Sequence, residues 1–167
     1  MPDVVMTCVG VLRNAPITEM EDDDLDEVVG VHLAGTFKVV RAAVPHLRGG
    51  SSIVTVSSGA AWGSTRGHSN YSAAKASIPG LTRALALGLA PHTRVNAVAP
   101  GAVESRMTRQ TAAQLGMDME TYRQRIAAQV PLARIGQPED VADVIRFLAS
   151  SMARYVTGQV IKVGGAP

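Results

Sequence analysis

The sequence has a single cysteine, Cys8, and only three lysines among its 167 residues. One cysteine cannot form an intramolecular disulfide, which is typical of proteins that work in a reducing cytosol. The basic residues are dispersed along the chain without a cluster, and the formal net charge is only +2. Because nucleic-acid-binding proteins gather lysine and arginine into patches, no nucleic-acid partner is expected.

Targeting signals and metal-binding patterns are also missing from the sequence. The first residues, MPDVVMTCVGVLRNAP, lack the positive segment and the long apolar segment of a signal peptide. No uninterrupted apolar run reaches the length that is needed to cross a membrane. His46, His68 and His92 do not have the spacing of zinc ligands. These absences predict a cytoplasmic protein with no membrane partner and no bound metal.

What the sequence does contain is an alternation of apolar runs with helical patterns. Continuous apolar runs such as DVVMTCVG are typical of strands covered on both faces, and strands are predicted at 3–10, 51–58, 94–101 and 158–165. Helices are predicted at 22–47, 71–90 and 136–150, with acids or Pro138 at their starts. This order predicts an α/β protein with a parallel sheet. A hydrophobic share of 46% suits one globular core.

Polar side chains gather where the second predicted strand ends. Ser57 and Ser58 end that strand, and Tyr71 and Lys75 begin the helix that follows. Residues four apart share a helix face, so the Lys75 ammonium should lie near the Tyr71 phenol and lower its pKa from about 10 by about 1–3 units. Tyr71 could then exchange a proton with an alcohol or carbonyl near neutral pH, while Ser58 hydrogen-bonds the same oxygen.

The same spacing also occurs in ordinary pairs of surface neighbours. Two observations favour a catalytic pair over that alternative. Lysine is rare in this chain, and the pair directly follows a strand that ends in Ser-Ser within an α/β pattern.

Four segments resemble, in order and in spacing, motifs of the short-chain dehydrogenase/reductase family: IVTVSSGAAWGSTRGHSNYSAAKAS, RVNAVAPGAVESRM, GQPEDVADVIRFLAS and YVTGQVIKV. The resemblance extends from residue 3 to residue 163. It implies a partial Rossmann-like, doubly wound parallel sheet of about four strands, equivalent to the family's strands 4-5-6-7. The chain, 1–167, would form one truncated domain, with a lid over the substrate at about 103–130.

The resemblance implies hydride transfer between NAD or NADP and a small alcohol or carbonyl substrate. In that reaction Tyr71 is the catalytic acid/base, Ser58 orients the substrate oxygen, and Lys75 tunes Tyr71 and binds the nicotinamide ribose. Cofactor contacts are implied for Gly10, Tyr71, Lys75, Pro100, Gly101, Val103 and Ser105, the last of which stands where threonine is usual.

His32 stands in the position of the family's fourth catalytic residue, an asparagine that holds a water for proton relay. A neutral imidazole can hold a water too, so a catalytic role is one interpretation. The other is a helix histidine, packed or exposed, with no role in the reaction. Both stay open at the level of the sequence.

The sequence also departs from the family pattern. The glycine-rich turn TGxxxGxG, which holds the pyrophosphate in the family, is absent, and TCVG replaces the usual Asn-Asn-Ala-Gly. We therefore expect a fragment or truncated form that does not bind the cofactor alone, with the strand at 3–9 left at the edge of the sheet. Pro79 should remove a helix hydrogen bond to the Lys75 carbonyl and kink the helix.

Two functions follow from these observations. The first is an NAD(P)-dependent oxidoreductase. The alternative is a catalytically silent relative that acts as an oligomerisation or binding module. The two long helices, 22–47 and 71–90, resemble the family's dimer-forming pair, so a homo-oligomer, a dimer or a tetramer, is expected in either case.

Overall fold

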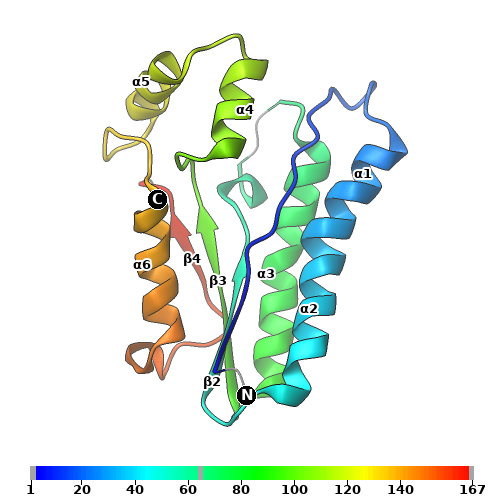
Figure 1. The fold of residues 1–167 in the computed structure, drawn as a ribbon, viewed down its shortest axis with the longest axis vertical. Helices are drawn as coiled ribbons and strands as arrows, with labels where there is room; N and C mark the ends of the chain where they lie inside the picture. Colours follow the sequence, from blue (N-terminus) through cyan, green and yellow to red (C-terminus); the bar gives the residue numbers. More distant parts are fainter. Residues whose placement is uncertain (1–2, 64–65, 166–167) are drawn as a thin grey trace.

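The computed structural model describes residues 3–63 and 66–165 (Figure 1). Its sheet has the spatial order β1-β2-β3-β4, and every neighbouring pair is parallel. The strands are β1 (Val4–Thr7), β2 (Ser51–Val56), β3 (Thr93–Pro100) and β4 (Val160–Val163). The predicted α/β class and four-stranded parallel sheet are confirmed. The outermost residues of the expected domain, 1–2 and 166–167, lie outside the described residues.

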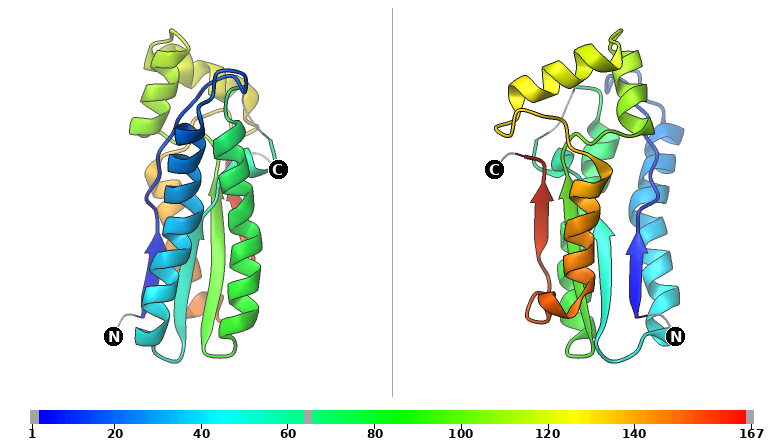
Figure 2. Two further views of the ribbon diagram at one scale, coloured as in Figure 1. Left: turned by 90° about the vertical axis from the view of Figure 1, so that its right-hand side faces the viewer. Right: turned by 60° about the vertical axis from the view of Figure 1, so that its left-hand side comes forward.

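Helices cover both faces of the sheet (Figure 2). One face carries the consecutive segments α1 (Asp22–Val29), η1 (Gly30–Gly35), α2 (Thr36–Ala43) and η2 (Val44–His46), together with α3 (Ser69–Leu89). The other face carries α6 (Pro138–Ala149), which is followed by η4 (Ser151–Ala153). Above the carboxyl ends of the strands lie η3 (Gly59–Ala61), α4 (Arg106–Gln114) and α5 (Met119–Gln129).

The core has one cluster on each side of the sheet. Ile53 packs with Val40 and Val95 on the α2 and α3 side. The next residue along β2, Val54, packs on the α6 side with Leu148. Because successive strand residues point to opposite faces, an apolar run such as SSIVTV is buried on both sides.

β1 does not follow the expectation of a strand covered on both faces. Val4 and Met6 are 43% and 45% exposed, whereas Val5 packs on the α2 and α3 side. The reason is position: β1 is the edge of the sheet, and α6 packs against β2, β3 and β4. The strand that the apolar run DVVMTCVG predicted is therefore present, and its expected place at the edge of the sheet is confirmed. The prediction that both of its faces are buried is wrong.

The predicted helix at 22–47 is continuous but changes its winding. Between α1 and α2, Gly30–Gly35 forms a π-helical turn that contains His32. Length and composition alone would allow Asp22–His46 to cross a membrane. The same stretch packs against α3 and β1 with Val28 and Val40 buried, and core helices pass the same test, so it does not indicate a membrane protein.

The second long helix, α3, runs through Pro79 as one element. Pro79 has no N–H to give to the carbonyl of Lys75, four residues earlier. That carbonyl accepts a hydrogen bond of 2.8 Å from the hydroxyl of Ser57, which is buried at the end of β2. A side chain of the sheet thus replaces the missing helix bond and ties α3 to the strand beside the predicted site.

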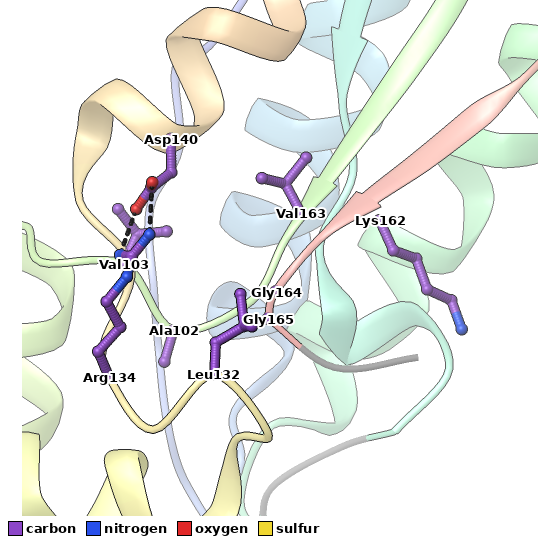
Figure 3. A pocket seen from close by; sticks show the side chains of 10 residues that line it. Ala102, Val103, Leu132, Arg134, Asp140, Lys162, Val163, Gly164 and Gly165 are labelled. Carbon is purple, nitrogen blue, oxygen red and sulfur yellow. Dashed lines mark hydrogen bonds and ion pairs between the residues drawn. The ribbon is translucent and has the colours of Figure 1, made fainter.

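A cavity of about 290 Å³ lies between the start of α6 and the end of β4 (Figure 3). Arg134 and Asp140 form a two-bond ion pair on its wall, with N–O distances of 2.6 and 2.7 Å. Lys162 extends away from that pair and lies 5.3 Å from the ring centroid of Trp62. Nearby, Gly101 and Gly164 approach so closely that a Cβ on Gly101 would meet Gly164 Cα at 2.8 Å.

Candidate active site

The structure brings Ser58 and Tyr71 to one cavity at the carboxyl end of the sheet. Ser58 lies two residues after the end of β2 and caps η3, while Tyr71 lies in the first turn of α3. The cavity has a volume of about 430 Å³, and Pro100 and Gly101 at the end of β3 also line it. Helices α4 and α5 form its outer wall, in the region predicted as a lid.

The Tyr71 phenol does not have the lowered pKa that the sequence predicted. Burial raises its pKa above 10.0, and a side-chain hydrogen bond with Ser58 offsets only part of that rise. Lys75 Nζ lies 5.8 Å from the Tyr71 ring centroid and donates its hydrogen bond to the Val56 carbonyl at 2.9 Å. The predicted proximity is present, but burial dominates the pKa of the phenol.

Lys75 is itself a buried cation, with 6% of its surface exposed. Burial lowers its pKa from 10.5 to about 8, and the charge of Cys8 acts in the opposite direction. The ammonium therefore stays charged at neutral pH at a cost in solvation, while lying between the end of β2 and the Tyr71 ring. Such a group can give up a proton more readily than a surface lysine.

His32 is buried against the same ring. It is 2% exposed, and its ring meets that of Tyr71 edge-on, with centroids 5.2 Å apart. Its Nε2 lies 2.8 Å from the carbonyl oxygen of Val11 and 3.3 Å from the Val11 nitrogen. Burial first, and the charge of Lys75 second, lower its pKa from 6.5 to about 4, although the Val11 carbonyl contact acts against this.

The imidazole of His32 is therefore neutral at pH 7, and one of its nitrogens is left over. When Nε2–H donates to Val11, Nδ1 is an acceptor, and Nδ1 has no hydrogen-bond partner among the described residues. Gly10 packs directly against the imidazole ring, because a Cβ on Gly10 would lie 2.7 Å from His32 Cε1. The interpretation of His32 as an exposed residue is excluded, and a buried residue with a free acceptor remains.

The residues implied as cofactor contacts divide into two groups. Pro100 and Gly101 line the cavity with Tyr71, and Gly10 packs against His32. Val103 instead pairs with Gly136 and lines the cavity of Figure 3. Ser105 caps α4, where its Oγ accepts the Thr108 N–H at 3.2 Å. The structure does not bring these last two residues to Tyr71.

Sequence reasoning missed Asn70, which positions Tyr71. Asn70 is 2% exposed, and its side-chain nitrogen donates to the Arg13 and Asp24 carbonyls at 3.0 and 3.3 Å. Its side-chain oxygen accepts the Tyr71 N–H at 2.7 Å. It thereby joins the start of α3 to α1 and to the segment after β1. An amide residue directly before the tyrosine was the available signal.

The comparisons with known proteins agree with this architecture. A family model described as Enoyl-(Acyl carrier protein) reductase matches residues 1–165. The chain is 42% identical over 167 residues to the 3-oxoacyl-(acyl-carrier-protein) reductase of Thermotoga maritima, covering 98% of this chain and 65% of that protein. It is 38% identical over 168 residues to the (3R)-3-hydroxyacyl-CoA dehydrogenase of Rattus norvegicus, covering 98% and 62%. The chain thus spans less than two thirds of the length of these curated relatives.

Solved structures show the same relationship. A short-chain dehydrogenase/reductase of Brucella melitensis superposes with a TM-score of 0.91 at 37% identity, covering 98% of this chain and 64% of that one. The ligand-free aldohexose dehydrogenase of Thermoplasma acidophilum superposes with a TM-score of 0.93 at 30% identity, covering 98% and 67%. With the Ser58, Tyr71 and Lys75 arrangement in place, these matches show that the chain belongs to the short-chain dehydrogenase/reductase family of oxidoreductases.

Proposed function

We propose that Ser58, Tyr71 and Lys75 are the catalytic residues of an NAD(P)-dependent oxidoreductase acting on a small alcohol or carbonyl compound. The observation that carries this proposal is that Ser58 and Tyr71 line one cavity together, beneath α4 and α5. The names of the relatives, a reductase and dehydrogenases, support the same reaction class.

The residues divide the proton chemistry between them. The nicotinamide, when bound, supplies or accepts the hydride. In the direction of reduction, Tyr71 donates its phenolic proton to the carbonyl oxygen as negative charge develops there. Burial keeps the phenol protonated at neutral pH, which suits this acid role. Ser58 Oγ accepts the Ala60 N–H at 3.2 Å, and its hydroxyl hydrogen, which acts on the Tyr71 phenol in this structure, would turn to the substrate oxygen bound beside that phenol.

Tyr71 must recover its proton after each turnover, and two groups behind its ring suit that task. Lys75, with a pKa of about 8, can release a proton near neutral pH. His32 Nδ1 is a buried acceptor that can hold a water in place beside it. We include His32 in the site as the holder of that water, in agreement with the catalytic interpretation of its position.

The residues present fit the nicotinamide half of the cofactor. The Lys75 ammonium lies at the end of β2, and Pro100 and Gly101 lie at the end of β3, at the edge where parallel sheets of this kind bind nucleotides. Lys75 would hold the nicotinamide ribose, and Pro100 and Gly101 would line the ring. The sequence contains no glycine-rich turn for the pyrophosphate. We therefore infer weak cofactor binding by this chain alone.

The test is oxidation of NADH or NADPH by 3-oxoacyl thioesters and simple ketones, at millimolar cofactor so that weak binding is compensated. Tyr71→Phe is expected to lower the rate by about 10²- to 10⁴-fold, because the phenolic proton is lost. Tyr155→Phe is the matched control, since Tyr155 is fully exposed and outside the cavity. A Tyr71→Phe rate equal to the wild-type rate would remove Tyr71 from its assigned role.

A second candidate is a binding or oligomerisation module. The observation in its favour is the edge of the sheet, where Met6 and Val9 are 45% and 81% exposed. They line a groove of about 400 Å³ with Val31 and Val39. Exposed Phe37 on α2 and Leu87 on α3 also support self-association. Absence of any cofactor oxidation by the wild-type chain would favour this candidate.

A further inference from the structure

The cavity above Ser58 and Tyr71 has an outer wall made by one face of α5. Tyr122, Arg125, Ile126 and Gln129 all line it, and their spacing of three, four and seven residues places them on one side of the helix. Most of the remaining wall is apolar or uncharged, with Leu12, Met107 and Leu115 among its members. A chain of carbon atoms therefore fits this space.

Arg125 is the only arginine or lysine among the residues that line the cavity, and none of those residues is an aspartate or a glutamate. No carboxylate of the described residues lies within ion-pair distance of its guanidinium. The guanidinium contacts Met117 Sδ at 3.8 Å. Burial raises the pKa of the Tyr122 phenol, and the charge of Arg125 offsets part of that rise. The cavity thus has a cation on its wall and no anion of its own.

Arg125 differs from two arginines nearby, Arg123 and Arg134, which are paired with carboxylates. Arg123 binds Glu104 with N–O distances of 2.5 and 3.1 Å and also contacts Glu120. Arg134 is held by the two-bond pair with Asp140 (Figure 3). These two arginines therefore have carboxylate partners, whereas Arg125, which lines the cavity, has no carboxylate partner among the described residues.

We propose that Arg125 is the receptor for an oxyanion carried by the substrate, a carboxylate or a phosphate, and so selects anionic substrates over neutral ones. A guanidinium presents parallel N–H donors that match the oxygens of either group. The apolar wall receives the carbon chain, and the reacting alcohol or carbonyl lies at Ser58 and Tyr71. The assignment of the reacting end rests on the proposed function.

Direct binding tests this proposal without hydride transfer. Calorimetry on the chain compares two pairs of probes: 3-hydroxyoctanoate with 3-hydroxyoctanamide, and 3-hydroxyoctanoyl pantetheine with and without its 4′-phosphate. In at least one pair the anionic member should bind about three- to tenfold more tightly, as expected for a charge-assisted contact at a partly open site. The pair that shows the preference identifies the oxyanion as carboxylate or phosphate.

Variants locate the preference. Arg125→Gln should bring the affinity ratio of the responsive pair close to one while changing the neutral probe by less than about twofold. Arg123→Gln is the matched control on the same helix and should keep the preference. A preference that survives in Arg125→Gln, equal affinities in both pairs, or no binding of any probe would overturn the assignment. The Tyr71→Phe rate test is read separately, so either proposal can fail while the other stands.

Discussion

His32 is kept neutral inside the protein, and stability should depend on pH as a result. Its pKa falls from 6.5 to about 4, through burial and then through Lys75. Between these values the unfolded chain binds a proton that the folded chain does not, so the free energy of unfolding decreases as pH falls from 6.5 towards 4. Above pH 6.5 the contribution is complete. The shift corresponds to about 3 kcal/mol.

Urea unfolding of the wild type and of His32→Gln, measured between pH 7.5 and pH 4, tests this at the level of one residue. The carboxylates titrate in both proteins, so the informative quantity is the difference between the two unfolding free energies. We expect that difference to shrink as pH falls. Only the wild type has an imidazole at this position, and the unfolded chain takes up its proton at a higher pH than the folded chain does. Parallel pH curves would show that the folded protein tolerates the charged imidazole.

The pKa of Tyr71 was predicted to be lowered and is raised instead, which shows what residue spacing leaves undetermined. The spacing of Tyr71 and Lys75 correctly placed the two side chains on one helix face. The pKa of the phenol depends on how completely it is removed from water, and that is decided by its burial in the folded protein. Arg125 was missed because ion pairs are visible only in the folded protein: Arg123 and Arg134 have carboxylate partners, and Arg125 has none among the described residues.

Among the elements, α3 depends on a single hydroxyl to replace the hydrogen bond that Pro79 cannot make. Ser57→Ala should leave the Lys75 carbonyl without a partner and lower the free energy of unfolding by about 1–3 kcal/mol. Pro79→Ala supplies an N–H to the same carbonyl, so it should lessen the effect of Ser57→Ala. Chemical denaturation of the wild type, the two single variants and the double variant gives the coupling energy.

Ser77→Ala is the matched control for this cycle. Ser77 lies on the same helix and its hydroxyl also binds a backbone carbonyl, that of Ala74, at 2.6 Å. Ser77 is half-buried, and its hydrogen bond does not involve Pro79. The effect of Ser77→Ala on the free energy of unfolding should therefore be small and additive with that of Pro79→Ala. If Ser57→Ala and Pro79→Ala were also additive, the hydroxyl would not be replacing the helix bond.

The order of strands and helices was predictable because the spacing of apolar residues follows which faces of an element are buried. β2 and β3 lie in the middle of the sheet, and their apolar runs match burial on both faces. β1 has the same kind of sequence but lies at the edge, so Val4 and Met6 are exposed. The π-turn at Gly30–Gly35 was not visible, since Val29, Leu33, Phe37 and Val40 keep a helical spacing of four, four and three residues through it. The sequence of a strand does not show whether the strand has a neighbour on both sides, because that depends on the order of the strands in the sheet.

At the scale of the whole molecule, the binding features lie unevenly along the top of the sheet. The end of β2, the end of β3 and the start of α3 supply the groups that suit a nicotinamide and its ribose. Beside β1, by contrast, the groove is mainly apolar, with Met6, Val9, Val31 and Val39 in its lining, and no arginine or lysine is among its lining residues. The cofactor's two halves should therefore contribute very differently to its affinity for this chain.

We expect the chain to bind reduced nicotinamide mononucleotide and the reduced dinucleotides with equal, millimolar affinity, because the adenosine half meets no dedicated group. Titrations followed by the fluorescence of the reduced nicotinamide measure both affinities, and Lys75→Met should weaken both alike by removing the ammonium that we propose to hold the ribose. Asp3→Asn, far from the site at the start of β1, serves as the control. A dinucleotide that binds more than tenfold tighter than the mononucleotide would reveal an adenosine site in these residues, and no binding of either would favour the interaction module.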